Sequence, residues 1–462
     1  MLHGLDMMEA QYQDVIGQFP FLNAFSHVVL GFHVDDTVPR ESIITGLQKA
    51  VDTIALQIPW LAGTVIHENV APGNSGVFRA APWPPGKLPN KLLRVKICDD
   101  IVLPFQDLVA AWAPISMLDG AVLAPYPGLP QGYQATTSEP PPVACFQANF
   151  VKGGLLLTCS AQHNMIDATG MLQLYQLLAV AMTDNKLPQK MVDAALLDRT
   201  TAIPLLGPND PPMSDHSHLK RSSTSLATRA TSKANYKWAY FRLHEDDIST
   251  LKTRASSGEG YDTAVPFIST NDALSALYWQ RIAHIRLLQH SSSLSPQSMS
   301  KFGRAIDVRR TMGVPSEYLG HMVYHTSTYL PLSSIATSPL STIACALRKS
   351  LTESNRPHHV RSYATYLSKE PDKSTLLYGG KYNPETDIAS SAVTRGGFDG
   401  MRFGVLGTPR FFRKPDFGAL PGCVYFMPPE EGWVIVLVCL KEDELQALKE
   451  DDVWRRWAEW VG

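Results

Sequence analysis

Residues 154–182 read GLLLTCSAQHNMIDATGMLQLYQLLAVAM and contain three patterns in succession. Residues 154–159 form an apolar run of strand length. Residues 171–182 carry apolar side chains at helical spacing. Between these two stretches lie His163 and Asp167, in the order His-x-x-x-Asp. The segment therefore predicts a buried strand that leads through a short polar turn into an amphipathic helix.

His163 is the candidate chemical group of this segment. Because the chain has 14 histidines, about one His-x-x-x-Asp is expected by chance at average aspartate usage. Its place at the end of a strand is more informative, since functional side chains are often held over a crevice by a rigid scaffold. From the local pattern, His163 is either a catalytic group or a satisfied interior histidine at a strand–helix turn.

The surrounding sequence predicts layered α/β structure. In the first half we expect a strand over 24–34, a helix over 40–58 and a strand over 61–66. Twelve of the 34 prolines lie between residues 82 and 142, which predicts loop and short edge strands there.

A second Pro- and Ser-rich stretch predicts an exposed crossover linker between two halves. The predicted division is an N-terminal half at 1–203, a linker at 204–235 and a C-terminal half at 236–462. In the C-terminal half we expect strands at 238–243, 302–308, 323–330, 423–427 and 433–440, and helices at 244–254, 270–290, 341–353 and from 442.

Composition excludes several classes of protein. The net charge is −2, which argues against a polybasic nucleic-acid binder. Residues 1–10 lack an apolar signal core, and the longest strongly apolar run, 433–440, is too short to cross a membrane. Cys159 and Cys439 lie in apolar runs and are expected to be buried free thiols. We expect a monomeric cytoplasmic protein with no nucleic-acid or membrane partner.

Motifs for nucleotides, metals and nucleophilic serine are missing. The chain has no G-x-G-x-x-G, no P-loop, no G-x-S-x-G and no zinc-like spacing of His and Cys. His216, His218, His358 and His359 are expected to lie in polar loops and to be ordinary surface histidines. We therefore predict no metal site.

Four loose motifs follow one another in the chain. They are Gly153-Gly154 with the His-x-x-x-Asp segment and Thr169-Gly170; Ser269-Thr270-Asn271-Asp272-Ala273-Leu274 before Tyr278-Trp279; Ala305-Ile306-Asp307-Val308-Arg309-Arg310 before Tyr318-Leu319-Gly320; and a Phe-Gly motif before a terminal hairpin. In this order they resemble BAHD-type acyltransferases, closest to the fungal branch that includes trichothecene acetyltransferases. The resemblance covers essentially the whole chain.

The resemblance implies an α/β, two-domain, chloramphenicol-acetyltransferase-like fold, with mixed sheets covered by helices and a tunnel between the halves. It implies an acyltransferase that uses acyl-CoA, most commonly acetyl-CoA, as co-substrate. The acceptor would be a small molecule, such as a fungal secondary metabolite acylated at oxygen or nitrogen. The variable loop at 119–142 is expected to line the acceptor pocket.

The resemblance also suggests roles for individual residues. It makes His163 the general base, and it pairs Asp167 with Arg309 in a clamp that fixes the loop. Three residues become candidates for the CoA pocket, and two serines become candidates for contact with the acceptor or the oxyanion. The former are Ser269, Ala305 and Asp307, and the latter are Ser390 and Ser391.

Some positions depart from the family pattern. The order of the flanking residues assigns the Phe-Gly motif to Arg402-Phe403-Gly404 rather than to Asp416-Phe417-Gly418, so Arg402 stands where the family has Asp. Ala392 replaces a Trp, and His321 replaces an Asn. These departures leave open a homologue that binds or cyclises a metabolite without acyl-CoA. A second alternative is a condensation-domain-like enzyme, since condensation domains share this fold.

Overall fold

The computed structural model describes residues 13–87, 90–133, 139–221, 235–290, 292–393, 398 and 400–462. Three segments discussed above lie outside the described residues. They are residues 1–10, residues 222–234 of the predicted linker and residues 134–138 of the predicted acceptor loop.

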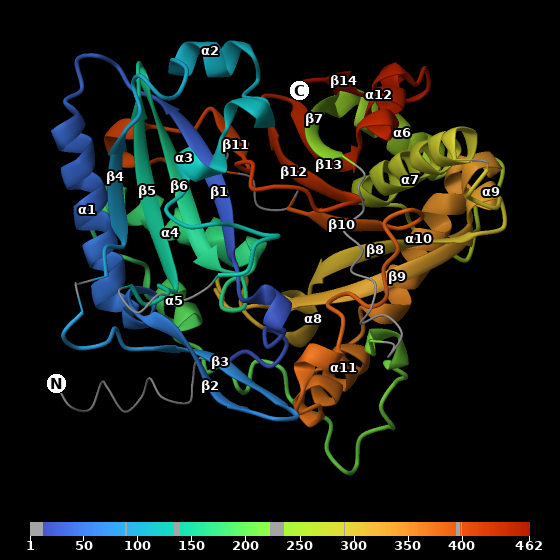
Figure 1. Ribbon diagram of the computed structural model, residues 1–462, viewed down its shortest axis with the longest axis horizontal. Coiled ribbons are helices and arrows are strands. Elements are labelled where there is room, and N and C mark those ends of the chain that lie inside the picture. Colours follow the sequence, from blue (N-terminus) through green and yellow to red (C-terminus); the bar gives the residue numbers. More distant parts are fainter. Residues whose placement is uncertain are drawn as a thin grey trace.

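Two large mixed sheets organise the described chain (Figure 1). The five-stranded sheet has the order β11-β1-β6-β5-β4, and the seven-stranded sheet has the order β14-β7-β13-β12-β10-β8-β9. β2 and β3 form a separate hairpin. The strands are β1 (Phe25–His33), β2 (Thr64–Ala71), β3 (Asn74–Ala81), β4 (Leu93–Ile97), β5 (Ala144–Val151), β6 (Gly154–Gln162), β7 (Tyr236–His244), β8 (Met299–Asp307), β9 (Val323–Pro331), β10 (Ile388–Ala392), β11 (Phe411–Arg413), β12 (Cys423–Glu430), β13 (Trp433–Lys441) and β14 (Glu459–Trp460).

Helices cover these sheets. In Figure 1, α1 and α4 lie against the five-stranded sheet, and α6, α7, α10 and α12 lie on the side of the seven-stranded sheet. The helices are α1 (Arg40–Gln57), α2 (Phe105–Ala110), α3 (Gly120–Leu123), α4 (Ala168–Asp184), α5 (Gln189–Ala195), α6 (Glu245–Ala255), α7 (Thr270–Gln289), α8 (Arg309–Met312), α9 (Leu332–Thr337), α10 (Leu340–Ser354), α11 (Pro357–Lys369) and α12 (Glu442–Glu450). None of the helices within the described ranges is both long and apolar enough to span a membrane.

A strand from the C-terminal half completes the first sheet. β11 pairs antiparallel with β1, with Val29 opposite Arg413. Phe403 and Phe412 of the same segment are buried in the hydrophobic core around β1, β5, β6, α1 and α4. This exchange ties the two sheets together and places residues that follow β11 between them.

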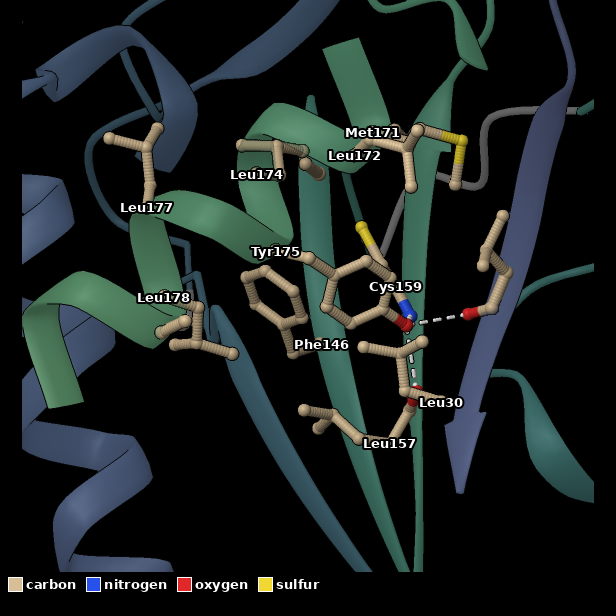
Figure 2. Close-up of a cluster of buried hydrophobic side chains, with 14 of the residues drawn as sticks. Leu30, Phe146, Leu157, Cys159, Met171, Leu172, Leu174, Tyr175, Leu177 and Leu178 are labelled. Carbon is tan, nitrogen blue, oxygen red and sulfur yellow. Dashed lines mark hydrogen bonds between the residues drawn. The ribbon is translucent and has the colours of Figure 1, made fainter. Parts of the chain in front are cut away.

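β6 leads to the candidate site and is buried along its whole length. It is paired with β1 on one side and β5 on the other, so its backbone is held on both edges. Tyr175 of α4 anchors the helix to this sheet: its hydroxyl lies 2.8 Å from the Cys159 nitrogen and 2.7 Å from the Leu157 carbonyl oxygen (Figure 2). The end of β6 is therefore a rigid position.

Most elements predicted from hydrophobic spacing are confirmed. The strand and helix expected at 24–34 and 40–58 are β1 and α1, and the capping box that opens α7 is formed by Ser269 and Asp272. All six cysteines are free, and Cys159 and Cys439 are buried as expected.

Other expectations are wrong. The strand expected at 61–66 begins only at Thr64, because residues 59–62 form a 3₁₀ turn after Pro59. The proline-rich region does contain the edge strand β4, but it also forms the short helices α2 and α3. His358 and His359 lie on α11 rather than in a loop. His216, in the predicted linker, is buried, with its Nε2 2.9 Å from Ser362 Oγ.

Candidate active site

A cavity of about 420 Å³ is lined by residues of both large sheets. The first sheet, the turn after β6 and α4 contribute His27, His163 and Met171, respectively. The second sheet contributes His325 and Tyr425, among others. Apolar and aromatic side chains make up most of the wall. A cavity of this size with a few polar groups is the usual form of a small-molecule site.

His163 follows directly after β6 and lines this cavity. Its main-chain N–H donates to the Ala24 carbonyl at 2.8 Å, which continues the pairing with the β1 side of the sheet. Burial lowers the pKa of the imidazole below its usual value, and the nearby Asp167 charge opposes this effect only in part. The side chain is therefore neutral at pH 7 and is able to accept a proton.

Asp167 accepts hydrogen bonds from four donors and is not among the residues that line the cavity. Its Oδ1 accepts from the Gly170 nitrogen at 2.8 Å and from Arg309 Nη2 at 2.9 Å. Its Oδ2 accepts from Arg309 Nη1 at 3.0 Å and from the Met322 nitrogen at 2.8 Å. Burial alone would raise the pKa of Asp167, but the Arg309 charge and these hydrogen bonds hold it below its usual value. The predicted pair is present, and it is buried rather than superficial.

Arg309 joins the turn after β6 to the loop that precedes β9. Besides Asp167, it donates to the carbonyl oxygens of Tyr318 at 2.9 Å and Gly320 at 2.7 Å, and to Asp307 Oδ1 at 2.9 Å. Through its buried contacts with Asp167 and the two carbonyl oxygens, the guanidinium clamps two segments that are far apart in sequence.

The glycine of the Thr169-Gly170 pair is required for steric reasons at the start of α4. Asp167 is the N-cap of this helix. A Cβ on Gly170 would lie 2.3 Å from the Leu319 carbonyl oxygen, far inside contact distance. Glycine therefore lets the helix start pack against the loop that Arg309 holds.

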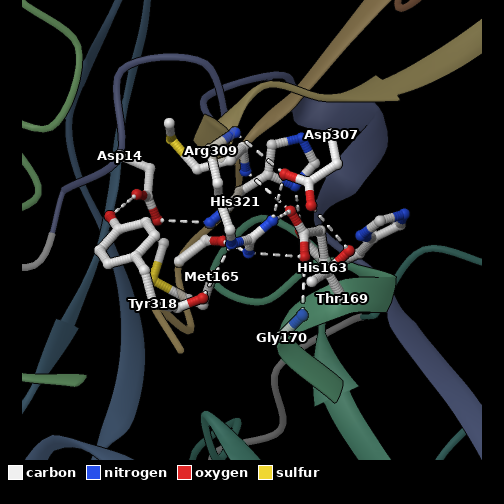
Figure 3. Close-up of polar contacts among 12 residues, drawn as sticks. Asp14, His163, Met165, Thr169, Gly170, Asp307, Arg309, Tyr318 and His321 are labelled. Atoms are coloured by element: carbon white, nitrogen blue, oxygen red, sulfur yellow. Dashed lines mark hydrogen bonds and ion pairs between the residues drawn. The ribbon is translucent and has the colours of Figure 1, made fainter. Parts of the chain in front are cut away.

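His321 contacts the backbone of His163. Its Nδ1 lies 2.9 Å from the His163 carbonyl oxygen, and its main-chain N–H donates to Asp14 Oδ2 at 3.2 Å. Burial lowers the pKa of His321 to about 3, so the ring is neutral. Since a carbonyl only accepts, Nδ1 must carry the proton. The histidine that replaces the family asparagine thus donates to the backbone of the candidate base (Figure 3).

The other predicted site residues fall in different places. Ala305, Ser390 and Ser391 line the cavity, and Ser390 Oγ donates to the Gly303 carbonyl at 3.1 Å. Ser269 is not among the lining residues, and its Oγ donates to Asp272 Oδ2 at 2.6 Å in the helix cap. Asp307 is also absent from the wall, and it contacts Arg309 and Thr169 instead.

The two Phe-Gly motifs also differ in position. Phe403 is fully buried in the hydrophobic core of the five-stranded sheet, where it packs edge-on against Phe32 with ring centroids 5.0 Å apart. Arg402 is exposed. Phe417 instead lines the cavity and stacks on His27, with ring centroids 4.5 Å apart. The placement of Phe403 supports a structural role for the motif assigned to it.

Sequence reasoning missed several polar groups of the cavity. They are His27, Lys301, His325, Tyr378 and Lys414. His27 interrupts a run that otherwise predicts a buried strand, a signal that could have singled it out. Lys414 carried no such signal, because its position depends on where β11 docks.

We find no set of metal-ligating residues in the part of the chain that the structure describes. Within those residues, no group of three or more His, Cys, Asp or Glu is arranged to hold an ion.

Comparisons with known proteins agree with this arrangement. Residues 24–182 match the model of the trichothecene 3-O-acetyltransferase-like N-terminal domain, and residues 129–453 match that of the Transferase family. The O-acyltransferase pigD of Monascus ruber is 41% identical, over 98% of this chain and 99% of pigD. The trichothecene 3-O-acetyltransferase TRI101 of Fusarium sporotrichioides is 32% identical, over 97% of this chain and 96% of TRI101.

Solved structures give the same answer for the fold. The crystal structure of F. sporotrichioides TRI101 complexed with coenzyme A and T-2 superposes with a TM-score of 0.88 at 30% identity, covering 98% of this chain and 99% of that one. Vinorine synthase shares the fold at a TM-score of 0.60 and 15% identity, covering 95% of this chain and 92% of that one. The expected two-domain α/β fold with mixed sheets is confirmed. With a family match over most of its length and full-length relatives above 30% identity, the chain belongs to the Transferase family, the BAHD acyltransferases.

Proposed function

We propose that the protein transfers an acyl group, most simply acetyl, from acyl-CoA to a hydroxyl of a small secondary metabolite, with His163 as the general base. Its relatives are named fungal O-acyl- and O-acetyltransferases, and the TRI101 structure carries coenzyme A and a toxin. Both facts support a CoA thioester as donor and a small-molecule acceptor.

One observation supports this function most strongly. A neutral imidazole lies on the cavity wall at the rigid end of β6, while the carboxylate four residues later is bound to Arg309. Asp167 is therefore engaged in holding the turn. Among the neutral imidazoles of the cavity, we assign the acceptor's proton to His163, which stands at the rigid end of β6.

The reaction needs no covalent enzyme intermediate. The unprotonated nitrogen of His163 takes the proton of the acceptor hydroxyl as its oxygen attacks the thioester carbonyl. The resulting tetrahedral oxyanion collapses, the C–S bond breaks, and the CoA thiolate takes the proton from the imidazolium. A positioned base of this kind contributes roughly 10²–10⁴ in rate.

Individual roles follow from position. We propose that Ala305 forms part of the wall along which CoA lies, and that Ser390 and Ser391 face the acceptor or the developing oxyanion, because all three line the cavity. Asp307 and Ser269 would act through the backbone segments that they hold.

The function is tested by incubating the protein with acetyl-, malonyl- and longer acyl-CoA in the presence of a fungal metabolite extract. Free thiol should appear together with a metabolite whose mass has increased by the acyl group. Equilibrium binding of acetyl-CoA separates this function from a homologue that uses the cavity without CoA, because such a homologue should not bind the thioester.

A further inference from the structure

Lys414 is a cationic group in an otherwise largely apolar cavity. It follows β11, the strand that the C-terminal half contributes to the first sheet, and its side chain lines the cavity. Its backbone is pinned by the Tyr240 hydroxyl, which accepts from the Lys414 nitrogen at 2.8 Å and lies 3.3 Å from its carbonyl oxygen. The position of the side chain is thus set by the strand exchange.

The ammonium of Lys414 is poorly satisfied by the protein. Within the described chain its Nζ makes one hydrogen bond, a long one of 3.4 Å to the His27 carbonyl, and forms no ion pair. It also lies 5.3 Å from the centre of the Tyr425 ring. The neighbouring Arg413 is opposite in this respect, since Glu430 binds its guanidinium through both carboxylate oxygens.

The second lysine that lines the cavity, Lys301, already has two hydrogen-bond acceptors from the protein. Lys301 Nζ donates to the carbonyl oxygens of Gly379, at 3.2 Å, and Lys381. Of the two lysines that line the described cavity, Lys301 therefore keeps one N–H donor for a ligand, whereas Lys414 keeps two.

Its surroundings point to the acceptor rather than to CoA. His27, whose carbonyl contacts Lys414, stacks on Phe417, and Phe25 of the same strand forms a bridge with Gly128 in the 119–142 loop. A second bridge joins that loop to the lysine's own segment, between Asp119 and Asp416. Lys414 thus lies beside the loop expected to vary with the acceptor.

Burying an unpaired ammonium in a largely apolar cavity costs free energy unless a ligand supplies an opposite charge or hydrogen-bond acceptors. Burial lowers the pKa of Lys414 to about 8, so the amine is still mostly protonated at pH 7. An anionic oxygen offers a charge-assisted hydrogen bond, which is stronger than a neutral one.

We propose that Lys414 is a specificity-determining residue that binds an anionic oxygen of the acceptor, such as a carboxylate, phenolate or enolate, at a position separate from the hydroxyl that is acylated. This inference rests on the proposed function only in that it identifies the bound anion as part of the acyl acceptor. The anion site itself is a property of the cavity and is measurable without acyl transfer.

The test compares two probes of nearly equal shape, 4-(hydroxymethyl)benzoate and its neutral methyl ester. Their affinities are measured by calorimetry at pH 7, on the full chain without CoA. Wild type should bind the anion more tightly than the ester. Lys414→Met should weaken binding of the anion about 10- to 100-fold and leave the ester unchanged, as expected for loss of a hydrogen bond between charged groups.

Two further variants serve as controls. Lys414→Arg keeps the charge and should retain the preference for the anion. Lys381→Met removes the same charge from an exposed side chain outside the cavity and should leave both affinities unchanged. Melting temperatures show that each variant is folded.

The inference is overturned if wild type shows no preference for the anion, or if Lys414→Met keeps that preference. It is also overturned if Lys414→Met weakens binding of CoA as much as that of the anion, because the lysine would then serve the donor. Acyl transfer to alcohols is assayed separately. Loss of transfer with an intact Lys414-dependent preference would reject the proposed function and leave the anion site standing.

Discussion

Replacing Asp167 with asparagine removes one charge from a buried pair without removing its volume. The side chains of Asp167 and Arg309 are 1% and 2% exposed, so water cannot replace the lost partner. Asparagine still caps α4 through its side-chain oxygen. Its NH2 group replaces the oxygen that accepts from the Met322 N–H and from Arg309 Nη1, so the variant loses these two hydrogen bonds together with the charge.

The expected cost is large on the scale of a single substitution. Removing one partner of a buried ion pair costs about 3–5 kcal/mol, because the other charge stays buried. With an unfolding entropy of about 2.1 cal/mol/K per residue, a chain of 462 residues loses roughly 3–5 °C in melting temperature. The Asp307 carboxylate next to Arg309 is 43% exposed and compensates only weakly.

Thermal unfolding followed by circular dichroism measures this effect. The matched control is Asp262→Asn, which weakens an exposed pair with Lys349 and should leave the melting temperature nearly unchanged, because water solvates both charges. The double variant Asp167→Asn/Arg309→Met should recover part of the loss. If Asp167→Asn melts like the control while its acyl transfer acquires a new pH profile, the clamp reasoning is refuted and Asp167 acts in catalysis.

Three other predictions concern the scaffold of the site. Tyr175→Phe should lower the free energy of unfolding by about 1–2 kcal/mol in urea, because a buried N–H and carbonyl lose their hydroxyl partner, and an unchanged midpoint would contradict that role. Lowering the pH from 7 to 5 should cost about 6 kcal/mol through His27, His321 and His325, or about 2 kcal/mol for each. All three have a folded pKa of about 3 against 6.5 unfolded, so the unfolded state gains protons first. A melting temperature that does not fall with pH would contradict their burial. Gly170→Ala should cost about 1–3 kcal/mol through its clash with backbone, whereas Gly46→Ala in α1, whose nearest contact would be 3.8 Å away, should be neutral or stabilising; equal effects would contradict the close approach at Gly170.

Local pattern was sufficient for the segment that carries the candidate base. The apolar run before Cys159 and the helical spacing after Met171 each depend on nearby residues, so strand, turn and helix follow from the sequence. The Asp167–Arg309 pair is different. Its partners lie 142 residues apart, and only the resemblance to a family predicted it.

The opposite wall of the cavity could not be predicted from local pattern. Lys414 reaches the cavity because β11 crosses to the first sheet, a tertiary event with no signature in a three-residue strand. His216 was expected on the surface because its neighbours are polar, yet α11 covers it. In both cases the environment comes from elements far away in the chain.

The central claim is tested most directly by the rate of CoA thiol release from acetyl-CoA in the presence of an accepted alcohol, with His163→Ala compared with His358→Ala. His358 lies on α11, away from the cavity wall, and its replacement should leave the rate unchanged. His163→Ala should lower the rate at least about 100-fold while the protein remains folded. Thiol release by folded His163→Ala at the wild-type rate would contradict the account, because another group would then have to take the proton.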